Sequence, residues 1–153
     1  MSFVVKQLEL FFFSAPMPKL ATKEREMLLQ SARDAVRYAY APYSGFKVGA
    51  AILTEDGKIF TGCNVENASY GLTICAERSA IFSAVANSAG GKLGLRAVVV
   101  VNEKEVPCPP CGACRQVIAE FGADTIVLFK SEQDYQELTI ADLLPSSFRL
   151  NQS

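Results

Sequence analysis

Four consecutive valines, Val98–Val101, constrain the fold of this chain more than any other part of its sequence. They form most of the apolar run Leu95–Val101. A strand that is apolar on both sides of its backbone must be covered on both faces, as in sheets that carry helices on each side. The run therefore predicts a strand in the interior of the fold.

Two further apolar-rich runs, 48–54 and 58–63, lie before the valines. They are joined through Glu55-Asp56-Gly57, and an Asp-Gly pair readily adopts the positive backbone φ angles of a tight turn. These two runs therefore predict an antiparallel hairpin. One more strand is expected at 125–129.

Helical patterns alternate with these strands. The first helix begins at Thr22, which is a candidate cap, and is ended by Pro42. The second covers 75–86 and has almost no polar face, so we expect it to be central and buried. The last two helices are expected at 111–121 and 140–144.

The alternation of strands and helices predicts a single-domain α/β/α sandwich with a mixed five-stranded sheet. A length of 153 residues, of which 50% are hydrophobic and 20% charged, fits one compact domain over residues 21–153. Residues 1–20 show no sustained periodicity and include two prolines. We expect them to form an N-terminal extension, either loose or as one edge strand.

Charge and histidine content exclude several classes of function. Lys and Arg number 15 against 16 Asp and Glu, so the formal net charge is -1 and nothing favours a nucleic-acid partner. The chain has no histidine, which excludes Ser-His-Asp and Cys-His nucleophile pairs and imidazole metal ligands. The apolar stretch around Phe11–Phe13 is too short to cross a membrane. We therefore expect a cytoplasmic protein with no membrane partner.

The five cysteines are the clearest chemical signal. Their number is odd and three of them fall within 108–114, which suits metal binding better than a disulfide framework. Cys111 and Cys114 are three residues apart, so in a first helical turn their sulfur atoms share one face. Cys75 begins another expected helix, and helix N-termini favour thiolates. Three cysteine ligands leave the fourth position of a tetrahedral zinc ion open, as in catalytic sites.

Two other cysteines compete for the metal. Cys108 forms a second Cys-x-x-Cys pair with Cys111, but the two intervening prolines disfavour the turn that would bring both sulfur atoms to one ion. Cys63 ends an expected strand and fits the role of a small buried hydrophobic residue. We therefore assign the metal to Cys75, Cys111 and Cys114.

Glu77 and Arg78 follow Cys75 within the same helical turn. In the absence of histidine, Glu77 is the natural group to take a proton from a water on the metal and pass it on. Arg78 would offset the excess negative charge of three thiolates around Zn²⁺ by donating to their sulfur atoms. The alternatives are a structural zinc module or interaction protein, in which Glu77 is incidental, and a redox role for the Cys-x-x-Cys pair.

Six short segments carry a resemblance to a known family. In chain order they are APYSGF at 41–46, VGAA at 48–51, GCNVENA at 62–68, CAERSA at 75–80, PCGACRQ at 110–116 and LLPSSF at 143–148. They resemble the small homotetrameric cytidine deaminases that act on free nucleosides, over about 32–148. The resemblance implies a cytidine deaminase-like fold with 21–153 as the catalytic domain. It also implies one zinc ion per subunit, held by Cys75, Cys111 and Cys114.

The resemblance also implies how the reacting base is handled. Glu77 would be the catalytic residue, which moves a proton from the attacking water to N3 of cytosine and then to the leaving amine. The backbone N–H of Ala76 and the carbonyl of Cys111 would contact the base. Arg78 and Gln116 would support the metal ligands from outside the coordination sphere.

The same resemblance implies a set of nucleoside contacts. Asn64 and Glu66 match residues that hold the ribose hydroxyl groups, and Phe46 matches an aromatic residue of the pocket. Other residues would reach the site of a neighbouring subunit in a homotetramer with shared active sites: Ala68, Tyr70 and Phe148.

The implied activity is hydrolytic deamination of cytidine and 2'-deoxycytidine to uridine and 2'-deoxyuridine with release of ammonia, as in pyrimidine salvage. Another aminated pyrimidine nucleoside is the alternative substrate. The chain departs from the family pattern at Cys108, which adds a thiol beside the metal loop, and in its first 20 or so residues, which extend beyond the shared core.

Overall fold

The computed structural model describes residues 19–150, so the extension or edge strand expected before residue 19 lies outside it. Its elements in chain order are α1 (Thr22–Val36), β1 (Val48–Thr54), β2 (Ile59–Cys63), a short 3-10 helix (Tyr70–Leu72), α2 (Ala76–Ala86), β3 (Leu95–Asn102), α3 (Gly112–Phe121), β4 (Ile126–Lys130), β5 (Tyr135–Thr139) and α4 (Ile140–Leu143). None of the helices in this part of the chain is long and apolar enough to cross a membrane.

The strands form one five-stranded sheet in the order β2-β1-β3-β4-β5. Strand β1 pairs antiparallel with both β2 and β3, and the hairpin between β1 and β2 turns at Gly57, where φ is 82°. Strands β3 and β4 are parallel, a pairing that requires a crossover connection, and α3 provides it. Strand β5 is antiparallel to β4. The predicted mixed sheet and its opening hairpin are confirmed.

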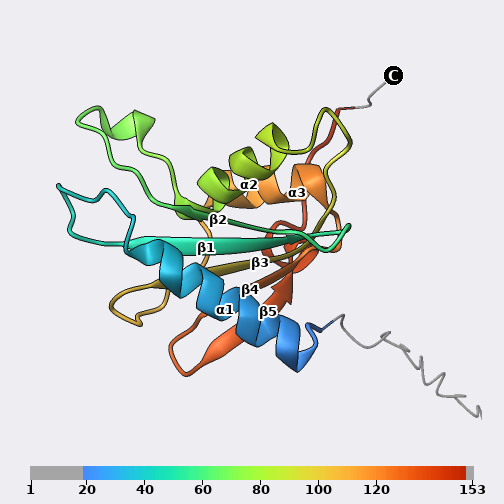
Figure 1. Ribbon diagram of the computed structural model, residues 1–153, viewed down its shortest axis with the longest axis horizontal. Coiled ribbons are helices and arrows are strands. Elements are labelled where there is room, and N and C mark those ends of the chain that lie inside the picture. Colours follow the sequence, from blue (N-terminus) through green and yellow to red (C-terminus); the bar gives the residue numbers. More distant parts are fainter. Residues whose placement is uncertain (1–18, 151–153) are drawn as a thin grey trace, which may run out of the picture.

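The two faces of the sheet bury two separate cores, as Figure 1 shows for the helices above and below it. Val98 and Val100 of β3 pack in the core with residues of α2 and α3. Val99 and Val101 pack in the core with residues of α1. The valine run is therefore buried on both faces, and the α/β/α sandwich is confirmed.

Helix α1 differs from the expectation at both ends. Thr22 is the first helical residue rather than the cap, because Ala21 occupies the N-cap position and no side chain caps the helix. The helix ends at Val36, well before Pro42, because the chain turns there and Tyr40 pairs with Val65 in an isolated bridge.

Helix α2 is central, but only its inner face is buried. Ala80, Ile81 and Ala84 are inaccessible to solvent, whereas Phe82 and Val85 are 49% and 43% exposed. The predicted burial is therefore correct for the inner face of α2 and wrong for Phe82 and Val85, because α2 belongs to an outer layer of the sandwich.

The start of α2 lies unusually close to the sheet because β2 carries Gly62 at the contact. A Cβ atom at this position would lie 2.6 Å from the carbonyl oxygen of Ala76 and closer still to the nitrogen of Ala80. The absence of a side chain at Gly62 thus lets the first turn of α2 rest directly on β2. This contact fixes the height of Cys75 and Glu77 above the sheet.

Strand β5 has no counterpart among the segments that the sequence predicted. Its sequence, YQELT, is largely polar, and it forms at the edge of the sheet through pairing with β4. Glu137 of β5 accepts hydrogen bonds from Arg25 Nε at 3.1 Å and from the backbone N–H of Leu20 at 3.3 Å. Leu20 is only 8% exposed, so the last residue of the expected extension belongs to the α1-side core.

Candidate metal centre and active site

The three cysteines predicted as metal ligands come together at the N-termini of two helices. Cys75 is the N-cap residue of α2, Cys111 is the N-cap residue of α3, and Cys114 lies in the first turn of α3. Their three sulfur atoms all lie within 4.8 Å of one another, and those of Cys75 and Cys111 are 3.9 Å apart. Tetrahedral zinc with Zn–S bonds of about 2.3 Å separates its sulfur ligands by about 3.8 Å. The cluster therefore suits zinc.

No fourth ligand joins this cluster from residues 19–150. Cys108 and Glu77 lie nearby but outside the group of mutually close ligand atoms. Burial raises the pKa of the Cys108 thiol to about 11, so this side chain is a neutral thiol at neutral pH. The arrangement has the three protein ligands of a catalytic zinc site rather than the four of a structural one.

The sulfur atoms of the cluster interact strongly with each other and with Arg78. A hydrogen bond from the Cys114 thiol and a second from Arg78 lower the pKa of Cys75 to about 5. The same hydrogen bond to Cys75, together with burial, raises the pKa of Cys114. Because metal ligands must be deprotonated, binding of a divalent cation here would release the proton that Cys114 holds in the metal-free protein.

Arg78 lies against the ligand sulfur, where the sequence analysis expected it. Its Nη2 atom is 3.5 Å from Cys75 Sγ and 3.5 Å from the carbonyl oxygen of Thr73. The hydrogen bond to Cys75 raises the pKa of the guanidinium group further, so Arg78 stays charged. Its Nε atom is buried and has no hydrogen-bond partner among the described residues. Arg78 thus brings a fixed positive charge beside the thiolates.

Glu77 is a buried carboxylate in the first turn of α2. Only 4% of it is exposed, and burial, with a smaller contribution from the charge of Cys75, raises its pKa to about 7. A group with this pKa gives up and accepts a proton with similar ease at neutral pH, which suits a general acid and base. The helix start therefore places a carboxyl group with a pKa of about 7 next to the cysteine cluster.

One cavity of about 360 Å³ joins the metal cluster to the expected nucleoside contacts. Its walls come from the segment before β1, the end of β2, the start of α2 and the loop before α3. The lining residues include Phe46, Asn64, Glu66, Ala76 and Glu77, together with Cys75, Cys108 and Cys111. Four of the predicted substrate contacts and the predicted catalytic residue therefore face a single cavity.

Asn64 and Glu66 already make hydrogen bonds with the segment before β1. Asn64 accepts from the backbone N–H of Val48 at 2.8 Å and donates to the carbonyl oxygen of Phe46 at 2.8 Å. Glu66 accepts from the backbone N–H of Tyr43 at 2.8 Å and from the hydroxyl group of Ser44, which lowers the pKa of the carboxyl group. Both side chains thus order the loop that carries Phe46.

Four predicted site residues lie away from this cavity within the chain. Tyr70 and Phe148 are 78% and 68% exposed, and Ala68 is also exposed. Tyr70 packs edge-on against Tyr43, with ring centroids 6.2 Å apart. Gln116 donates from Nε2 to the carbonyl oxygen of Phe148 at 3.2 Å and so holds the C-terminal segment rather than a metal ligand.

Sequence reasoning did not single out three residues that shape the site. Ser44 bonds to Glu66, Thr73 accepts from Arg78, and Asn102 lies beside Cys108. Ser44 belongs to the segment APYSGF that carried the resemblance, so its position was a signal. Thr73 acts through its backbone carbonyl and Asn102 through a tertiary contact, and neither property is visible in a sequence.

Comparison with known proteins agrees with this geometry. The model of the cytidine and deoxycytidylate deaminase zinc-binding region matches residues 22–130. The chain is also 50% identical over 127 residues to a cytidine deaminase from Halalkalibacterium halodurans, an alignment that covers 82% of this chain and 94% of the relative. The chain belongs to the cytidine deaminase family. The family is one of zinc-dependent hydrolytic deaminases, consistent with the three-cysteine cluster.

Solved structures of the family share the fold. The crystal structure of a cytidine deaminase from Burkholderia pseudomallei matches with a TM-score of 0.73 and 52% identity, covering 80% of this chain and 98% of that one. A cytidine deaminase from Mycobacterium tuberculosis matches with a TM-score of 0.70 and 41% identity, covering 83% and 98%. The family fold predicted from the sequence is thus confirmed.

Proposed function

We propose that the protein deaminates cytidine and 2'-deoxycytidine to uridine and 2'-deoxyuridine, releasing ammonia, and that it serves pyrimidine salvage. The observation that carries this proposal is the position of Glu77. This buried carboxylate, with a pKa of about 7, lines the same cavity as the metal ligands Cys75 and Cys111. A structural zinc module has no need for a proton-transfer group in that place.

The reaction divides into a contribution from the metal and contributions from the chain. When bound, zinc supplies the Lewis acidity that activates water for attack on C4 of cytosine. Glu77 takes a proton from the attacking water and gives it to N3 of the base. Glu77 then takes the remaining proton from the hydroxyl group now on C4 and gives it to the amino group; the C4–N bond breaks, C4 keeps a carbonyl oxygen, and ammonia leaves. Arg78 keeps the ligand set from becoming too negative, because its guanidinium group donates to Cys75.

The cavity also offers groups to hold the nucleoside. Ala76 is the first residue of α2, so its backbone N–H has no partner within the helix and is free to donate to the base. The Asn64 side chain spends one N–H of its amide on the Phe46 carbonyl oxygen and one lone pair of Oδ1 on the Val48 N–H. Its second N–H and second lone pair remain for a ribose hydroxyl group. Glu66 would exchange its bond with Ser44 for a second hydroxyl group. Phe46 would pack against the base.

We also propose a homotetramer in which subunits share active sites. Phe148, Tyr70 and Ala68 are exposed and lie away from the cavity of their own chain, so they are available to a neighbouring one. The exposed side chains Phe82 and Val85 on α2 provide an apolar face for assembly. Sedimentation equilibrium tests this proposal, and a monomer that retains full turnover would contradict it.

The proposed activity is tested by measuring zinc content and the absorbance change from cytidine to uridine on one preparation. We expect about one zinc per chain and turnover of cytidine and 2'-deoxycytidine.

The chain is also 34% identical to blasticidin-S deaminase from Bacillus cereus over 112 residues, so other aminated pyrimidine nucleosides form the second candidate class. If the zinc-bound protein released ammonia from those compounds but not from cytidine, they would be its substrates and the first proposal would be wrong. Robust turnover of single-stranded DNA or RNA would contradict the preference for free nucleosides.

Replacing Arg78 with glutamine should lower kcat/KM for cytidine about 10- to 100-fold, the usual cost of losing a partner of a metal ligand. The charge next to Cys75 is lost, so the bound ion becomes a weaker electrophile. Arg96→Gln is the matched control, because Arg96 pairs with Glu24 at 2.9 Å on the other face of the sheet. An unchanged rate and pH–rate profile in Arg78→Gln would rule out the proposed role.

We further place the protein in the cytoplasm. All five cysteines are free thiols in the described structure, and the proposed zinc site requires reduced thiols. Fractionation of the native cells, with detection of the protein by antibody, tests this placement.

A further inference from the structure

The loop that follows β3 lies beside the segment that carries Phe46. Val48 at the start of β1 pairs with Asn102 at the end of β3, so the two adjoining loops leave the sheet side by side. The backbone N–H of Glu103 also donates to the carbonyl oxygen of Lys47 at 3.2 Å. The loop 103–106 therefore borders the wall of the cavity, although none of its residues was a predicted site residue.

Asn102 holds this loop in one conformation. Asn102 is buried, with only 3% of the residue exposed. Oδ1 accepts from the backbone N–H of Lys104 at 3.1 Å and of Val106 at 3.2 Å, and Nδ2 donates to the carbonyl oxygen of Val106 at 2.7 Å. With these bonds Glu105 adopts a φ of 51°, which is uncommon for a residue other than glycine.

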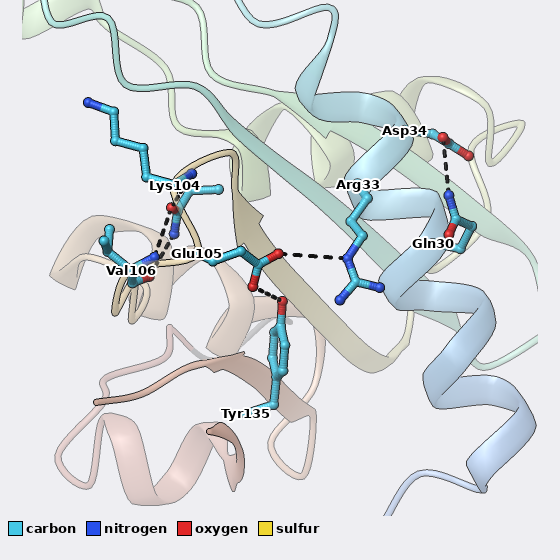
Figure 2. A network of polar contacts seen from close by, with 8 residues as sticks. Gln30, Arg33, Asp34, Lys104, Glu105, Val106 and Tyr135 are labelled. Carbon is cyan, nitrogen blue, oxygen red and sulfur yellow. Dashed lines mark hydrogen bonds and ion pairs between the residues drawn. The ribbon is translucent and has the colours of Figure 1, made fainter. Parts of the chain in front are cut away.

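Two of the three charged side chains of the loop, those of Lys104 and Glu105, point in different directions, as Figure 2 shows. Glu105 turns toward α1 and β5, where it accepts from the hydroxyl group of Tyr135 at 3.1 Å and lies 3.9 Å from Arg33 Nε. Lys104 turns the other way, and its Nζ atom lies 5.7 Å from the centroid of the Phe46 ring. This distance is within the range of a cation–π interaction.

We propose that Lys104 is a positioning residue for the nucleoside, because its ammonium group over the Phe46 ring holds that ring in place as a wall of the cavity. The inference rests on the proposed function, in which Phe46 contacts the base. Asn102 fixes the backbone from which Lys104 extends, and Glu105 anchors the same loop to α1 and β5. Lys104 itself stays outside the reacting groups.

The expected effect is on substrate binding rather than on chemistry. Lys104 is exposed, and a cation–π contact at an exposed site is weak. Lys104→Gln keeps a polar side chain but loses the charge, so KM for cytidine should rise about two- to five-fold, while kcat changes less than about two-fold. Lys104→Arg retains a cation that can stack on the ring and should restore KM to near the wild-type value.

Arg37→Gln is a matched control, because the guanidinium carbon of Arg37 lies 5.0 Å from the centroid of the Tyr38 ring, just after α1. It removes the same charge and the same type of contact outside the residues that line the cavity, so KM should stay unchanged. A double-mutant cycle adds the decisive readout. In a Phe46→Leu background, Lys104→Gln should have little further effect on KM, because the ring that Lys104 holds is absent.

The outcomes separate this inference from the proposed function. An active wild type in which Lys104→Gln leaves KM unchanged would overturn the inference alone. The same conclusion would follow if Lys104→Gln raised KM equally with and without the Phe46 ring, since Lys104 would then act by another route. A zinc-bound wild type that does not turn over cytidine would overturn the proposed function and, with it, the inference.

Discussion

Glu77→Gln should lower the kcat for cytidine by about 10³-fold or more while leaving about one zinc ion per chain. General acid–base catalysis contributes typically 10²- to 10⁴-fold, and Glu77 is proposed to carry two proton transfers in succession. Glutamine has nearly the same shape as glutamate but cannot accept and return a proton. Cytidine turnover by absorbance and zinc by elemental analysis, measured on the same samples, check this result.

The stability of the same variant provides a control for misfolding. Burial raises the pKa of Glu77 to about 7, so at neutral and higher pH the folded metal-free protein carries an unfavourable buried charge. A neutral glutamine removes that penalty, and metal-free Glu77→Gln should therefore be at least as stable as the metal-free wild type at pH 8. If Glu77→Gln turned over cytidine within a few-fold of the wild-type rate, the catalytic role of Glu77 would be wrong, and a structural zinc site would be favoured.

Cys114→Ser should abolish both stable zinc binding and turnover. Cys114 is fully buried and supplies one of three ligands, and serine does not replace a thiolate at a soft metal site. Zinc present at 1,000 times its Kd stabilises the folded state by about 4 kcal/mol. In a domain of this size each kcal/mol corresponds to roughly 2–4 °C. We therefore expect Tm to fall by about 8–16 °C relative to the zinc-bound wild type, as measured by calorimetry with zinc analysis.

Cys108→Ala is the comparison that decides between the two Cys-x-x-Cys pairs. Cys108 lies three residues before Cys111 but outside the sulfur cluster, so its removal should leave zinc content unchanged. Loss of zinc in Cys108→Ala, with zinc retained in Cys114→Ser, would mean that the metal is held by the other pair. A disulfide in the freshly purified protein would instead support a redox role.

Local patterns predicted most of the elements. The valine run, the Asp-Gly turn and the cysteine-led helix starts lie where the sequence placed them, because each depends on residues close together in the chain. Three of the differences share one cause. Strand β5 forms through pairing with β4, α1 ends at Val36 before the chain reaches the Tyr40–Val65 bridge, and Leu20 is buried against other elements. None of these contacts leaves a periodic signal in the sequence.

The sequence by itself predicted the chemical groups: three thiols and one carboxylate at two helix starts, in a chain without histidine, indicate a zinc site with a proton-transfer group, and the resemblance of six segments to cytidine deaminases implies the reaction. Only the tertiary structure decided how that chemistry is arranged. Cys75 is 36 residues from Cys111, and their sulfur atoms lie 3.9 Å apart because α2 and α3 cover the same face of one sheet. Likewise, the burial that raises the pKa of Glu77 and the contact of Lys104 with Phe46 come from segments that meet only after folding. The residue types set which reactions are possible, whereas the burial of each group and the distances between groups are set only when the chain folds.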